Sequence, residues 1–121
     1  FQRPHKIGKY IEDESLQNHK AFGYDHCFIK KDLAKDEIAI LSCSKSKRKL
    51  TIKTSYPSIV IYTCNYPKAF KFNPLIIDNM KYHAICLECQ FIPNGINMDN
   101  VNKAILKKDE KYEQYINYKF D

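Results

Sequence analysis

The sequence predicts an all-β fold, an antiparallel β-sandwich, from three observations. Apolar and polar residues alternate with period two along several segments, which is the pattern of half-buried strands. Helical periodicity is nearly absent, and short polar turns separate the segments, as in sheets that are built from hairpins. The 121 residues are 44% hydrophobic and 28% charged, close to the globular average, so we expect one packed domain over residues 1–121.

Three strands are expected in the first half of the chain. Gly23–Lys30 is extended, and Glu37–Cys43 and Leu50–Tyr56 both alternate. The basic turn Ser44–Lys49 joins the last two segments as a hairpin. One face of Leu50–Tyr56 carries Leu50, Ile52, Thr54 and Tyr56, and the other carries Thr51, Lys53 and Ser55.

Four further strands are expected in the second half. Ser58–Asn65 is dense in β-branched and aromatic residues, and His83–Phe91 alternates. Lys103–Leu106 is a short strand, Lys107–Glu110 is its turn, and Tyr112–Phe120 closes the chain. The apolar face of the His83 segment carries Ile85, Leu87, Cys89 and Phe91, and the last segment is expected to turn Tyr112, Ile116, Tyr118 and Phe120 inward.

Two long stretches, before Gly23 and from Asn65 to Lys81, lack clear periodicity and are predicted to be loops. Loops on a rigid β scaffold often carry binding groups.

The formal net charge is +6, and Ser44–Lys49 is strongly basic. A nucleic-acid patch would use such charge. However, the charge is gathered in one turn with no aromatic stacking platform beside it, so we favour a solvated hairpin tip. Nucleic acid is therefore not the expected partner and is kept only as an alternative.

The five cysteines have no regular spacing, and we expect reduced thiols in a cytoplasmic protein. Cys86 and Cys89 have the spacing of half a zinc site, but no second pair completes it. On a strand the two thiols would point to opposite faces, so no metal is expected. No apolar run approaches the roughly 20 residues of a membrane helix, so no membrane partner is expected.

Two carboxylates could carry chemistry. Glu88 lies inside an expected strand between Leu87 and Cys89, so it either faces solvent or lines a functional face. Asp25 precedes His26, and this pair is either a hydrogen-bonded turn or part of a polar site.

Four segments, in order, resemble motifs of the galactose mutarotase (aldose 1-epimerase) family. They are Phe1–Gly8 (FQRPHKIG), Gly23–Phe28 (GYDHCF), Tyr56–Asn65 (YPSIVIYTCN) and Cys86–Asn97 (CLECQFIPNGIN). They are similar to the family patterns FRxPxxIG, G(Y/F)DHxF, PGxQxYTxN and LExQxxPDxxN. Each motif alone is weak, but four in the family's order are specific.

The resemblance implies the C-terminal portion of a galactose mutarotase-like supersandwich, and an isomerase that interconverts the α and β anomers of aldohexoses such as galactose and glucose without a cofactor. Carried over by motif, Glu88 is the general base and Asp25 binds sugar hydroxyls. The family's catalytic histidines lie upstream of the segment that matches Phe1. We therefore expect the remainder of a longer polypeptide as a partner, and an inactive isolated chain.

Some positions depart from the family patterns. Gln2, Ser58 and Val60 stand where Arg, Gly and Gln are usual, and the usual Gln contacts the sugar in many members. Asn94 replaces the Asp of the last motif. A non-catalytic carbohydrate-binding relative with the same fold is the alternative function.

Overall fold

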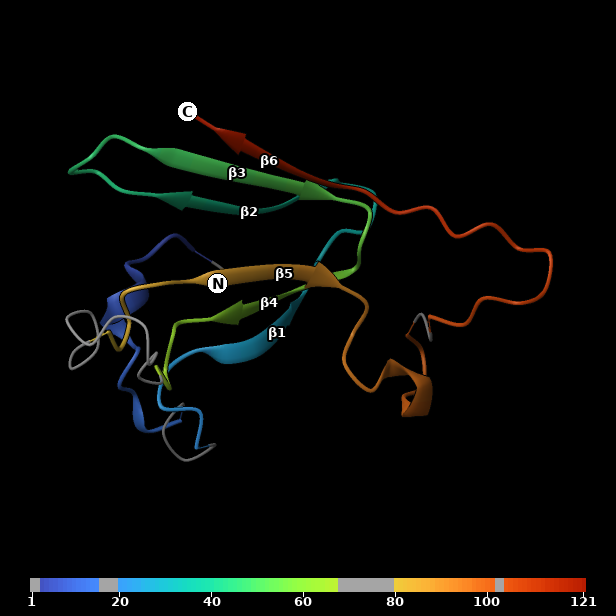
Figure 1. Ribbon diagram of the computed structural model, residues 1–121, viewed down its shortest axis with the longest axis horizontal. Coiled ribbons are helices and arrows are strands. Elements are labelled where there is room, and N and C mark those ends of the chain that lie inside the picture. Colours follow the sequence, from blue (N-terminus) through green and yellow to red (C-terminus); the bar gives the residue numbers. More distant parts are fainter. Residues whose placement is uncertain (1–2, 16–19, 68–79, 102–103) are drawn as a thin grey trace, which may run out of the picture. The chain divides into compact units, whose positions relative to one another are not determined.

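The computed structural model describes residues 3–15, 20–67, 80–101 and 104–121 (Figure 1). The fold is all-β, as predicted, with two three-stranded antiparallel sheets and only short helical turns in the described residues. The chain divides into two compact units. The first unit comprises residues 1–26 and 60–87, and the second comprises residues 27–59 and 88–121.

One sheet has the strand order β2-β3-β6 and belongs wholly to the second unit (Figure 1). It consists of β2 (Glu37–Ser42), β3 (Lys49–Thr54) and β6 (Ile116–Phe120). The predicted hairpin is confirmed, because β2 pairs antiparallel with β3 and the Cys43 amide donates to the Arg48 carbonyl oxygen at 3.0 Å. The turn that joins the two strands is exposed along its whole length.

The alternation predicted for β3 sets the packing of this sheet. Ile52 and Thr54 are fully buried and Lys53 between them is exposed, as predicted, but Thr51 on the Lys53 face is also buried, at 8% exposure. Lys53 lies opposite Glu37 on β2, and its ammonium is 3.4 Å from the Asp36 carboxylate. Acidic partners thus meet the outward-facing cation, which favours this register over one slipped by a residue.

The C-terminal strand is shorter and more exposed than predicted. Residues 112–115 are not a strand, and Ile116, Tyr118 and Phe120 are 41%, 44% and 76% exposed. Their direction was predicted correctly, because Tyr118 lies opposite the buried Ile52 in the register and so shares its face. Burial fails because β6 is an edge strand, paired only with β3 in this sheet.

Side-chain hydrogen bonds and one backbone hydrogen bond, from the Ser55 amide to the Tyr115 carbonyl oxygen at 3.3 Å, hold the segment before β6. The Thr54 hydroxyl donates to the Tyr115 carbonyl oxygen at 2.7 Å, and the hydroxyls of Tyr56 and Tyr112 are hydrogen-bonded. Tyr112 is nevertheless 55% exposed and does not face a core.

The predicted short strand at Lys103–Leu106 is also wrong over its described part. Residues 104–106 are irregular and exposed, and Lys103 lies outside the described residues. The turn predicted after it is present, with the Glu110 amide donating to the Lys107 carbonyl oxygen at 3.2 Å.

The other sheet has the order β1-β4-β5, formed by β1 (Asp25–Ile29), β4 (Ser58–Tyr62) and β5 (Cys86–Gln90). Strands β1 and β4 run antiparallel: the Thr63 amide donates to the Tyr24 carbonyl oxygen at one end, and the Lys30 amide donates to the Pro57 carbonyl oxygen at the other. The central strand is the most buried, with Ser58 and Ile59 at 0% and 2% exposure. All three strands fall within segments predicted to be extended.

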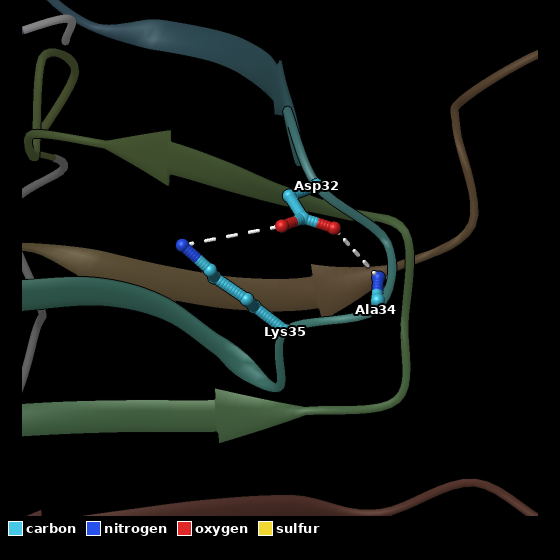
Figure 2. Close-up of polar contacts among 3 residues, drawn as sticks. All are labelled: Asp32, Ala34 and Lys35. Carbon is cyan, nitrogen blue, oxygen red and sulfur yellow. Dashed lines mark hydrogen bonds and ion pairs between the residues drawn. The ribbon is translucent and has the colours of Figure 1, made fainter.

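The connection from β1 to β2 turns at Asp32 (Figure 2). Its carboxylate accepts a hydrogen bond from the Ala34 amide at 3.0 Å and lies 3.9 Å from the Lys35 ammonium. An Asp side chain that satisfies the backbone two residues ahead is a common turn device. The ion pair is exposed and adds little stability.

A search of the described residues for membrane-spanning helices finds none with the length and apolar character that crossing requires.

Candidate functional site

Asp25 opens β1 in the first unit, and its side chain is exposed. Its backbone amide donates to the Nδ1 atom of His26 at 2.9 Å. Because Asp25 and His26 both lie in β1, this bond joins neighbouring residues of a strand, and the local turn that the sequence offered as an alternative is not formed. Loss of hydration raises the pKa of the Tyr66 hydroxyl, and the negative charge of Asp25 raises it further.

The backbone that leads into Asp25 adopts unusual dihedral angles. Phe22 has φ 52° and Gly23 has φ 145°, both in the left-handed half of the map. A Cβ atom on Gly23 would lie 2.3 Å from the Asn65 Oδ1 atom and 2.9 Å from the Thr63 Oγ1 atom. The glycine of the Gly-Tyr-Asp-His segment is therefore required by both its conformation and the space around it.

Thr63 and Asn65, which follow β4, hold this backbone through hydrogen bonds. The Tyr24 amide donates to Thr63 Oγ1 at 3.0 Å, and Asn65 Nδ2 donates to the Tyr24 carbonyl oxygen at 2.8 Å. The Thr63 hydroxyl in turn donates to Asn65 Oδ1 at 2.7 Å. Thr63 and Asn65 are 3% and 4% exposed, so two of the sequence motifs meet in one buried polar network.

Glu88 lies at the centre of β5 in the second unit and is exposed, whereas Cys89 beside it is 8% exposed. The alternation predicted for this segment is confirmed from Ala84 to Cys89, because Ile85 and Leu87 are half-buried and Ala84 and Cys86 are exposed. It ends at Gln90, which is half-buried like Phe91. Burial raises the pKa of the Tyr118 hydroxyl, and electrostatic interactions with Cys89 and Glu88 raise it further.

Asp25 and Glu88 belong to different units. That their carboxylates line one cleft stays a prediction.

The first unit contains a hollow of about 360 Å³. Ile7 and Gly8 of the N-terminal motif line it together with Thr63 and Ile85. Neither candidate carboxylate contributes to its wall. The hollow does show that a third motif packs near the polar network of Thr63.

The described histidines do not form a metal site. No cluster of three or more His, Cys, Asp or Glu side chains in the described residues could hold an ion. Cys86 is exposed and Cys89 is buried, as expected for residues three apart on a strand. His83 Nδ1 lies 3.1 Å from the Lys81 carbonyl oxygen, and His19 lies outside the described residues.

Comparison with known proteins identifies the family. The family model described as aldose 1-epimerase matches residues 1–119. The chain belongs to the aldose 1-epimerase family. It is 28% identical to the galactose mutarotase of Sus scrofa over 93% of its length, and 27% and 28% identical to those of Homo sapiens and Bos taurus over 99%. The chain spans about a third of the length of these relatives (32–34%).

Sequence reasoning for this aldose 1-epimerase family chain selected the two carboxylates but missed the roles of Thr63 and Asn65. Both residues were noted only as parts of a strand motif. The sequence does offer one indication: the apolar strand from Ser58 ends in Thr-Cys-Asn. Polar side chains at the end of a buried strand need hydrogen-bond partners. Their partner, Tyr24, is 39 and 41 residues away, so no local pattern names it.

Proposed function

We propose that the protein is an aldose 1-epimerase that interconverts the α and β anomers of an aldohexose such as galactose or glucose. The observation that carries the proposal is the family match over residues 1–119, which includes a glutamate held on the exposed face of a strand at Glu88. Its similarity to proteins named galactose mutarotase also supports the proposal.

In the proposed reaction, the Glu88 carboxylate accepts the proton of the anomeric hydroxyl. A histidine protonates the ring oxygen, and the bond between C1 and that oxygen breaks to give the open-chain aldehyde. Rotation about the C1–C2 bond presents the other face of the carbonyl. Reversal of both proton transfers then closes the ring as the opposite anomer, so the atoms and charges balance without a redox step.

The position of Glu88 suits a general base. Its exposure leaves the carboxylate hydrated and open to approach by a substrate hydroxyl. Its strand neighbour Cys89 is buried on the opposite face, which fixes the direction of the side chain. A positioned acid or base typically contributes about 10²- to 10⁴-fold in rate.

Asp25 is proposed to accept hydrogen bonds from sugar hydroxyls. Its exposed carboxylate follows the rigid Gly23–Tyr24 backbone, so a binding group would be presented in one orientation. Val60 lacks the amide with which the family's usual Gln contacts the sugar. The proposed site therefore relies more heavily on Asp25.

The proposed acid is a histidine upstream of the segment that matches Phe1, supplied by the remainder of a longer polypeptide. The one-third coverage of the relatives supports this arrangement.

The experiment that tests the proposal is polarimetry of α-D-galactose and α-D-glucose mutarotation by the intact polypeptide. Glu88→Gln keeps the side-chain shape but removes the proton acceptor, so we expect the rate to fall by about 10²-fold or more. The matched control is Glu37→Gln, which changes an exposed glutamate of β2. Retention of more than about a tenth of the wild-type rate by Glu88→Gln would reject the base role.

A further inference from the structure

Thr63 and Asn65 form a polar network with the backbone of Tyr24 inside the first unit. Thr63 and Asn65 are almost completely buried, and such positions are usually apolar unless hydrogen bonds compensate the lost hydration. The Thr63 hydroxyl accepts from the Tyr24 amide and donates to Asn65. The network is therefore closed, with each group acting on the backbone beside Asp25.

The same backbone is held from a second direction. The Tyr82 hydroxyl donates to the Phe22 carbonyl oxygen at 2.6 Å, and the Tyr82 amide donates to the Cys64 carbonyl oxygen at 3.2 Å. Cys64 and Tyr82 themselves have φ values of 52° and 66°.

Residues with positive φ thus occur both within residues 22–24 and in the segments bonded to them. Each non-glycine residue of this kind costs conformational energy, which the neighbouring contacts must offset. A strained backbone with hydrogen bonds on both sides fits a role in holding a side chain in place.

That side chain is Asp25, the next residue along the chain. Its amide is already engaged with His26 Nδ1, and the Tyr24 amide and carbonyl are engaged with Thr63 and Asn65. The peptide units on both sides of the Tyr24 Cα atom are therefore hydrogen-bonded, and the second of them leads into Asp25. The backbone from which the Asp25 side chain extends is therefore held in place before any sugar binds, and such preorganisation improves binding.

We infer that Thr63 and Asn65 are positioning residues that orient the Asp25 carboxylate toward sugar hydroxyls. This inference rests on the proposed function, in which Asp25 binds the substrate. Neither residue needs to touch the sugar, because both act through the backbone of Tyr24.

The test uses near-isosteric variants of the intact polypeptide and measures kcat and KM for galactose by polarimetry. Thr63→Val removes the hydroxyl but keeps the shape, and Thr63→Ser keeps the hydroxyl. Asn65→Asp keeps the acceptor for Thr63 but loses the donor to the Tyr24 carbonyl. We expect Thr63→Val and Asn65→Asp to raise KM about tenfold with a much smaller change in kcat, and Thr63→Ser to restore KM to within about twofold of wild type.

A control variant and a double variant distinguish a positioning role of Thr63 from a purely structural role. Thr54→Val also removes a buried hydroxyl that hydrogen-bonds the backbone, and it is expected to lower Tm without changing KM. In an Asp25→Asn background, Thr63→Val should change KM by less than about twofold, because residues that act through one another are not additive. Amide exchange at Tyr24 should accelerate in Thr63→Val, whatever the activity.

The outcomes distinguish this inference from the proposed function. If Asp25→Asn raises KM but Thr63→Val and Asn65→Asp do not, the positioning role is wrong and the proposed function stands. An equal rise in KM from Thr63→Val with and without Asp25→Asn also overturns the positioning role. If Asp25→Asn leaves the kinetics of an active enzyme unchanged, the binding role of Asp25 fails, and the inference fails with it.

Discussion

Substitution of Gly23 by alanine should be strongly destabilising. The new Cβ would lie 2.3 Å from Asn65 Oδ1 and 2.8 Å from Asn65 Cγ, so the Asn65 side chain must move. Its movement breaks buried hydrogen bonds to Tyr24 and Thr63, at about 1–3 kcal/mol for a group left unsatisfied. The positive φ at Gly23 adds about 1–3 kcal/mol for a residue with a side chain.

The two effects together predict a loss of about 2–6 kcal/mol in the free energy of unfolding, a large part of the stability of an ordinary domain. Urea unfolding followed by far-UV circular dichroism measures it. Gly8→Ala is the matched control, because no atom lies within 4 Å of the added Cβ, and its effect should stay below about 1 kcal/mol. If Gly23→Ala were as stable as Gly8→Ala, the proposed packing of the two motifs would be refuted.

Three further predictions concern the carboxylates, the thiols and the isolated chain. Asp25→Asn should raise KM more than Glu88→Gln does, since a group that binds ground and transition states alike mainly affects binding. A lower Tm with unchanged kinetics would show that Asp25 only stabilises the fold. Hydrogen bonding to Ser46 lowers the pKa of the exposed Cys43 thiol, whereas burial raises the pKa of the Cys89 thiol. Near neutral pH, iodoacetamide should therefore alkylate Cys43 before Cys89, as measured by peptide mass spectrometry, and Ser46→Ala should slow the alkylation of Cys43. Faster labelling of Cys89 than of Cys43 would contradict this prediction. The 121-residue chain alone should not accelerate mutarotation measurably in polarimetry, because it lacks the proposed acid, and enzyme-level activity would mean that one of its own histidines serves.

Local sequence patterns predicted where the strands lie better than they predicted which strand faces are covered by the rest of the protein. The alternation around Ile52 and Cys89 predicted that these two side chains are buried and that Lys53 and Glu88 are exposed, because period two follows directly from strand geometry. It did not predict the burial of Thr51, which lies on the other face of β3. The burial of Tyr118 could not be predicted in the same way, since it depends on whether another strand lies beyond the sheet edge. Ser58 departs from the family's usual Gly, and its hydroxyl donates to the Gln90 carbonyl oxygen at 2.7 Å, a compensation that only the tertiary structure reveals.

The candidate site shows the same division between local and tertiary information. Glu88 was selected because an acid inside an apolar strand is unusual, and its exposure confirms that it is on the outward face. The family resemblance supplied its proposed role. Thr63 acts on Tyr24 across 39 residues of sequence, so its contribution follows from the pairing of β1 with β4 and not from its own neighbours.

The most direct test of the central claim is a crystal structure of the intact polypeptide with D-galactose bound. The account predicts that one sugar lies between the two carboxylates, with Glu88 within about 2.6–3.2 Å of the anomeric oxygen and Asp25 in hydrogen-bond contact with other hydroxyls. A sugar bound in contact with neither residue, or carboxylates that lie on opposite faces of the sheet, would contradict it.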